Sequence, residues 1–129
     1  MKTLSLILSL LLITTNVYAE WTFIEETVNG DVLFYEKSTV KRNGDKVRVW
    51  MYVTVSPNNK EAESLNMGSS RALFEIDCVN EINKTLSLQS FTKPGLKGDM
   101  TNHDVKNSTI DYIVLNSSHA TLMKLVCKK

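Results

Sequence analysis

Two histidines and two cysteines are the residues of this 129-residue chain best suited to catalysis or metal binding. His103 precedes Asp104 in a polar stretch, but one neighbouring acid cannot orient an imidazole as a nucleophile–base–acid triad requires. His119 stands alone near the start of an apolar periodic segment, where we expect its side chain to be exposed. We therefore predict no catalytic residues and a protein that is not an enzyme.

The sequence also lacks the residue spacings that are typical of metal sites and phosphate sites. No two His, Cys, Asp or Glu residues stand at helix or hairpin spacing with a third ligand in view, and Glu61 and Glu63 form an ordinary charged cluster in a loop. The glycines of Gly95-Leu96-Lys97-Gly98 are not followed by the helix pattern that a phosphate-binding loop needs. We expect no metal and no cofactor.

The two cysteines, Cys78 and Cys127, have no third cysteine to compete for either of them. In an exported protein such a pair most simply forms one disulfide, which would close 127 minus 78, or 49, residues. A pair of free, reactive thiols is the alternative. Because no Cys-X-X-Cys spacing is present, the pair does not indicate redox catalysis.

The period-two segment Lys46–Ser56 indicates a binding protein more strongly than an enzyme. One face of this predicted strand is apolar and should join the core: Val47, Val49, Met51, Val53 and Val55. The other face carries Arg48, Trp50 and Tyr52, which are residue types enriched at binding hot spots. Two interpretations stay open for this face. It forms a contact with a partner or a second subunit, or a loop or second layer covers it.

Basic residues cluster around the predicted turn at Asn43-Gly44, whose two residues tolerate the positive φ of a type I′ turn. They are Lys41, Arg42, Lys46 and Arg48. Such a cluster could form a basic edge for an acidic partner segment. Charges that keep an edge hairpin from pairing with other chains would explain it equally well.

The remaining elements follow from turn signals and hydrophobic period. Further strands are predicted at residues 21–28, 32–35, 70–78, 85–92 and 109–115, and a helix is predicted at 119–127. Long polar loops should span 57–68, with a helical turn at 60–65, and 93–108. The expected fold class is α+β, mainly β, with about six antiparallel strands and a C-terminal helix packed on one face and held by the disulfide.

Composition indicates one domain, since 43% of the residues are apolar and 22% are charged. Lys2, the apolar run Leu4–Ile13 and the small residues Val17 and Ala19 are typical of a signal peptide, which predicts cleavage before Glu20 and a single domain over residues 20–129. Cleavage removes Lys2, so the net charge falls from +1 to zero. Neutrality argues against nucleic acid as a partner, and no anchor should remain after cleavage.

The order of these features resembles the surface-adhesin protein E family of Gram-negative bacteria. The matching elements are an early Trp21, Val32-Leu33-Phe34-Tyr35 with Ser38 and Val40, the turn Arg42-Asn43-Gly44, Val47-Arg48-Val49-Trp50, Ser70-Arg71-Ala72-Leu73-Phe74-Glu75-Ile76-Asp77-Cys78, and the segment Leu122–Cys127. The resemblance spans nearly all of residues 20–129. It implies an antiparallel sheet with a disulfide-tethered helix, and a tendency to form homodimers.

The resemblance also implies a function, because the family's name-giving member binds host matrix and serum proteins such as vitronectin and laminin. Ala19 is followed by Glu20 rather than by the cysteine of a lipoprotein. The periplasm, the cell surface and secretion therefore all stay open as locations. The alternative function is a periplasmic protein that inhibits or escorts another envelope protein.

Overall fold

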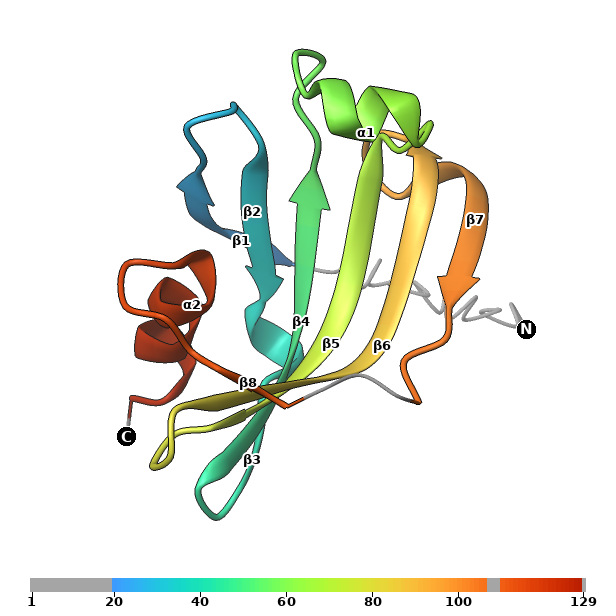
Figure 1. Ribbon diagram of the computed structural model, residues 1–129. Helices are drawn as coiled ribbons and strands as arrows, with labels where there is room; N and C mark the ends of the chain where they lie inside the picture. Colours follow the sequence, from blue (N-terminus) through green and yellow to red (C-terminus); the bar gives the residue numbers. More distant parts are fainter. Residues whose placement is uncertain (1–19, 107–109, 129) are drawn as a thin grey trace, which may run out of the picture.

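The computed structural model describes residues 20–106 and 110–128. The predicted signal peptide and the start of the predicted strand at 109–115 lie outside these ranges. The chain forms one antiparallel sheet with a helix against one face, as the sequence predicted (Figure 1). The strands are β1 (Trp21–Glu26), β2 (Val32–Glu36), β3 (Lys41–Asn43), β4 (Lys46–Thr54), β5 (Ser69–Asp77), β6 (Ile82–Lys93), β7 (Lys97–His103) and β8 (Asp111–Tyr112).

The order through the sheet is β1-β2-β4-β5-β6-β7, with β3 paired to β4 and β8 paired to β6. Five of the six predicted strands lie on this main path, and the sixth corresponds to β8 beside it. Strand β7 lies within the segment that we expected to be a loop at 93–108. Its side chains are all exposed, so no hydrophobic alternation marks it. Backbone pairing to β6 forms this strand, and polar pairs such as Gln89 and Asn102 face each other across it.

Several boundaries also differ from the prediction. The last strand shortens to the two residues of β8, and β6 already begins at Ile82. Asn43 belongs to β3, where it pairs with Lys46, so the turn consists of Gly44 and Asp45. Only Gly44 has a positive φ there, +61°, which is the φ pattern of a type II′ turn rather than the predicted type I′.

Helix α2 (Ser118–Val126) covers one face of the sheet (Figure 1). It begins where the Ser117 hydroxyl accepts a hydrogen bond from the Ala120 amide at 3.2 Å. The predicted helical turn in the loop after β4 is present as α1 (Lys60–Ser64), capped by Asn59, and lies at the end of the strands. The 3₁₀ turn Lys37–Thr39 links β2 to β3.

The core lies between α2 and the sheet. Its buried side chains are Leu33, Tyr35, Val47, Val49, Met51, Ala72, Phe74, Ile76, Leu122 and Val126. Val47, Val49 and Met51 confirm the predicted phase of β4, while Val53 and Val55 are only half-buried near its end. The disulfide Cys78–Cys127 joins the end of β5 to the end of α2 and overturns the alternative of two free thiols.

Candidate functional site

The face of the sheet opposite α2 carries a row of aromatic side chains. Alternation along β4 directs Trp50 and Tyr52 to this face because Val49 and Met51 point to the core. Cross-strand pairing brings Phe34 of β2 opposite Tyr52, and Trp21 of β1 follows at the next strand. In the described part of the chain, no α-helix lies over this surface (Figure 1). We call it the aromatic face and define it by Trp21, Phe34, Trp50, Tyr52, Arg71 and Gln89.

The rings of the aromatic face contact one another across three strands. The centroid of Tyr52 lies 5.3 Å from that of Trp21 and 5.4 Å from that of Phe34, with which it stacks at 19°. Phe23 meets Phe34 edge-on at 6.1 Å. Offset and edge-to-face geometries of this kind stabilise aromatic pairs by about 0.5–1.5 kcal/mol. The rings therefore hold one another in place while remaining only half-buried or, for Phe23, exposed.

The side chain of Arg71 lies over the ring of Trp50. The guanidinium of Arg71 lies 5.4 Å from the ring centroid of Trp50 and 5.7 Å from that of Phe91. Arg71 also donates a hydrogen bond to Gln89, whose amide in turn donates to Asn102 at 2.7 Å. No role was predicted for Arg71, although its phase on the solvent side of β5 was a usable signal.

The turn between β6 and β7 closes one end of the aromatic face. The Gly95 amide donates a hydrogen bond to the Tyr52 hydroxyl at 3.0 Å, and the Leu96 amide donates to the buried Ser69 hydroxyl at 3.0 Å. Gly68 permits this close approach because a Cβ there would lie 2.5 Å from the Lys93 carbonyl carbon. Tyr52 is thus fixed at both its ring and its hydroxyl.

The four predicted basic residues gather at the β3–β4 hairpin, but they divide between the two faces. Lys41 stands opposite Arg48 in the register, and these two side chains and Lys46 share the face of Trp50. Arg42 points the other way and donates to the carbonyl oxygens of Val126 and Lys128, at 3.3 and 3.4 Å. Arg42 therefore caps the C-terminus of α2, a role that the sequence analysis did not foresee.

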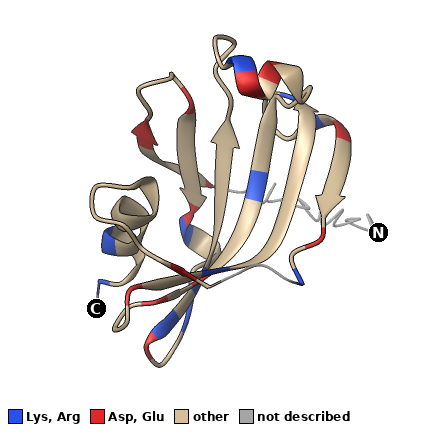
Figure 2. Cartoon of the chain, in the orientation of Figure 1, with Lys and Arg blue, Asp and Glu red and all other residues tan. Residues whose placement is uncertain are grey.

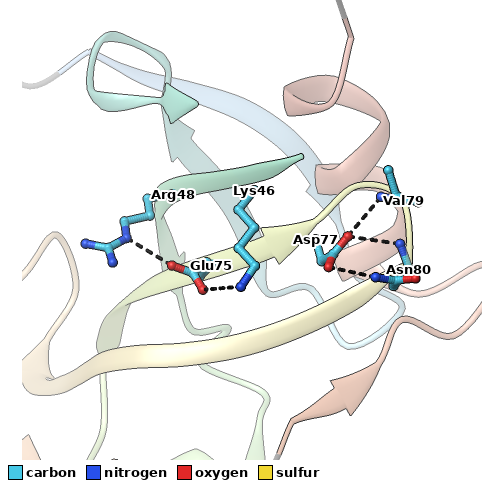
Figure 3. A network of polar contacts seen from close by, with 6 residues as sticks. All are labelled: Lys46, Arg48, Glu75, Asp77, Val79 and Asn80. Atoms are coloured by element: carbon cyan, nitrogen blue, oxygen red, sulfur yellow. Dashed lines mark hydrogen bonds and ion pairs between the residues drawn. The ribbon is translucent and has the colours of Figure 1, made fainter. Parts of the chain in front are cut away.

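One carboxylate serves two of these cations. Glu75 on β5 lies between Arg48, whose Nε is 3.1 Å from Oε2, and Lys46, whose Nζ is 3.9 Å from Oε1 (Figure 3). Both basic side chains are 60% exposed, so each ion pair is screened by water and contributes little stability. Blue segments mark this concentration of basic residues at the hairpin in Figure 2.

Asp77, next along β5, has a structural role. Its carboxylate accepts hydrogen bonds from the Val79 and Asn80 amides, at 3.1 and 2.9 Å, and from the Asn80 side chain at 3.0 Å (Figure 3). The hydrogen bonds from Asn80 are the main reason why the pKa of Asp77 lies below its ordinary value. The negative charge of Asp77 thus holds the tight turn between β5 and β6.

His119 is not exposed, contrary to the prediction. Its ring lies edge-on to Phe74 with centroids 4.9 Å apart, and its Nε2 is buried without a hydrogen-bond partner among the described atoms. Burial lowers the pKa of His119, and the charge of Asp111 partly offsets this effect. The face of α2 that packs on the sheet thus includes His119 as well as Leu122 and Val126.

His103 and its neighbours do not assemble a catalytic triad. The His103 Nε2 lies 2.8 Å from the Ser90 hydroxyl, while Asp104 accepts a hydrogen bond from the Lys106 amide at 2.9 Å. No described carboxylate bonds to the His103 ring, and His103 is exposed on β7. Residues 20–106 and 110–128 also contain no group of three His, Cys, Asp or Glu side chains placed to bind a metal ion.

Comparison with known proteins gives the family. The model of the surface-adhesin protein E family matches residues 21–128, which is nearly the whole described chain. This chain belongs to the surface-adhesin protein E family. Membership implies an exported protein and points to a binding protein rather than an enzyme. No curated protein matches the sequence significantly, and none of the described helices is long and apolar enough to cross a membrane.

Solved structures of Haemophilus influenzae protein E share the fold. A second crystal form aligns with a TM-score of 0.63 at 11% identity, covering 88% of this chain and 91% of that one. Another structure of H. influenzae protein E gives 0.61 at 11%, covering 88% and 87%. The protein from a non-typeable strain gives 0.58 at 10%, covering 88% and 78%. At this identity the likeness establishes the sheet-and-helix fold alone.

Proposed function

We propose that this protein is an exported, non-enzymatic binding domain that holds a protein partner on its aromatic face. The observation that carries the proposal is the row of half-exposed rings from β1, β2 and β4 on a sheet face that no described helix covers. Tryptophan, tyrosine and arginine are the side chains most enriched at binding hot spots. Membership of a surface-adhesin family supports host matrix or serum proteins, such as vitronectin and laminin, as the partner class.

The contacts within the aromatic face support this role energetically. Tyr52 is held by two neighbouring rings and by the Gly95 amide, and Arg71 is held by Gln89. Side chains that are already ordered lose less conformational entropy when a partner docks. Rigid aromatic anchors of this kind therefore retain more of their contact energy as affinity.

Substitution of Trp50 tests the proposal. We expect Trp50→Ala to weaken binding to immobilised vitronectin or laminin about thirtyfold, the loss typical of a hot spot. Leu65→Ala is the matched control, because Leu65 is 68% exposed beside α1, away from the aromatic face. Equal affinities for the two variants, each with a wild-type circular dichroism spectrum, would contradict the proposal.

A second copy of the chain is the competing occupant of this face, since isologous pairing would make a dimer. Analytical ultracentrifugation of the wild-type protein and Trp50→Ala separates the cases. A dimer that the substitution splits would assign the aromatic face to self-association. If Trp50→Ala has the same mass in solution as the wild-type protein, the result supports an external partner.

The cellular location of the protein distinguishes a host partner from a partner in the bacterial envelope. We expect an antibody against residues 20–129 to label intact cells and protease treatment of intact cells to remove the signal. Release by osmotic shock alone would instead support the alternative function, inhibition or escort of another periplasmic protein.

A further inference from the structure

A hollow of about 390 Å³ lies beside the β3–β4 hairpin. Its lining is wholly polar or charged: Lys41, Arg42, Asn43, Lys46, Arg48 and Glu75. We call it the basic groove. Lys41, Lys46 and Arg48 present their charges here against one carboxylate, while the Arg42 guanidinium is directed to the C-terminus of α2. The groove therefore carries an excess of positive charge on a chain whose formal net charge is only +1.

The sheet register at this groove does not favour stability. Lys41 is the direct cross-strand partner of Arg48, and like charges in that position repel. Glu75 is already shared by Lys46 and Arg48, and no described carboxylate lies within ion-pair distance of Lys41. Glu75 compensates these cations only in part, because one carboxylate faces three of them. A local arrangement that works against folding in this way is typical of a binding site.

The positive charge is concentrated at the basic groove and does not extend to the neighbouring hollow. A second hollow of about 180 Å³ shares Lys46 and Glu75 with the groove and adds Lys84, but it also adds Asp77. The carboxylate of Asp77 offsets the charge of Lys84 there. The unbalanced cations therefore lie at the β3–β4 end, where strands about 4.8 Å apart present Lys41 and Arg48 side by side.

We propose that the basic groove binds a sulfated polysaccharide. A chain of sulfate groups would pair with Lys41, Lys46 and Arg48 at once and relieve their repulsion. No apolar or aromatic residue lines the groove, so it lacks the side-chain types that anchor most protein partners. Such anchors are available on the aromatic face instead, so this second site is independent of the proposed protein partner.

Heparin is the probe for the test, with the full exported chain as the protein. We expect Lys41→Gln/Lys46→Gln to weaken heparin binding at least about tenfold at 0.1 M salt, and to make the affinity less sensitive to salt, because fewer ion pairs form. Lys60→Gln/Lys97→Gln removes the same charge from α1 and β7 and should bind as the wild type does. Equal losses in the two double variants would overturn the proposal, since net charge alone would explain them.

The single variant Lys41→Gln adds a readout that a structural role would not produce. It should weaken heparin binding while leaving the melting temperature unchanged or raising it, because cross-strand repulsion is removed. A lowered melting temperature with unchanged binding would overturn the proposal. Binding of poly-glutamate with the affinity of heparin would also overturn it in favour of an acidic peptide, whereas failure of neutral dextran to bind supports it.

Discussion

On β4, Val47 and Val49 point toward α2 and are fully buried, whereas Trp50 and Tyr52 point the other way and stay half exposed. The α2 face is covered by a helix that a disulfide ties to β5. On the aromatic face, the side chains contact one another, as Arg71 does over Trp50, and the β6–β7 turn bonds to Tyr52 at one end. One alternating strand thus contributes to two surfaces with different packing.

The two faces differ in the contacts that surround each side chain. On the α2 face, apolar side chains remove one another from water, and their burial drives folding. On the aromatic face, rings and a guanidinium hold one another in place but keep part of their surface in water. Substitutions on the first face should therefore mainly affect stability, and substitutions on the second should mainly affect binding.

The largest effect should come from breaking the link that holds α2 to the sheet. Cys78→Ser or Cys127→Ser opens a 49-residue loop, which in the chain-entropy model costs about 4 kcal/mol. For a domain of this size the melting temperature should fall by roughly 15–20 °C, as thermal unfolding followed by circular dichroism would measure.

The double variant Cys78→Ser/Cys127→Ser is the control for this experiment. It should melt close to either single variant, because both cysteines act through one bond. A melting temperature within a few degrees of the wild type in all three variants would show that α2 packs on the sheet without the disulfide. Stability would then reside in apolar burial alone.

The next largest effect should come from the buried side of α2. Leu122 is fully buried among the core residues, so Leu122→Ala should lower the free energy of unfolding by about 3 kcal/mol through lost burial and a cavity. Urea unfolding measures this loss. Partner binding by the folded fraction should stay at the wild-type level, and a parallel loss of affinity would break the separation between the two faces.

A smaller effect is expected within the aromatic face. A double-mutant cycle of Trp50→Ala and Arg71→Ala should give a coupling of about 0.5–1 kcal/mol in unfolding free energy, the size of a partly exposed cation–π contact. Ser70→Ala in place of Arg71→Ala controls for general perturbation of β5, because Ser70 faces the other side. A coupling near zero would mean that Arg71 covers Trp50 without holding it.

Hydrophobic period predicted the elements that have an apolar face. The phase of β4, the β5 strand and α2 followed from alternation or a helical stripe because each buries one side. β7 escaped detection because its residues are all exposed and its backbone pairs with β6 at the sheet edge. The length of β8 could not be predicted either, because it depends on where β6 offers free backbone groups.

Only part of the candidate site was predicted from the sequence. Trp21, Phe34, Arg71 and Gln89 of the aromatic face were not singled out as binding residues, and none of the contacts was predicted. Trp50, Tyr52 and the basic residues of the hairpin stood out by type and phase. The position of Arg71 over Trp50, and the turn of Arg42 toward the end of α2, depend on cross-strand register and on tertiary docking. Neither the cross-strand register nor the tertiary docking can be derived from the spacing of residues within one strand.

The smallest effect concerns His119, whose pKa is lowered by its burial between α2 and the sheet. Burial is the main cause, with Asp111 acting in the opposite sense. In the unfolded chain the histidine should titrate near 6.5. As the pH falls through that value toward the lower pKa of the folded state, the unfolded chain takes up the proton first.

The stability that neutral His119 provides is thus complete above about pH 6.5 and decreases below it. The free energy of unfolding, measured with urea between pH 7.5 and 5, should decline on acidification, and His119→Gln should flatten that decline. His103→Gln is the control, because it removes an exposed imidazole on β7. If His103→Gln flattened the curve and His119→Gln did not, the pH response would belong to the sheet edge rather than to the packed α2 face.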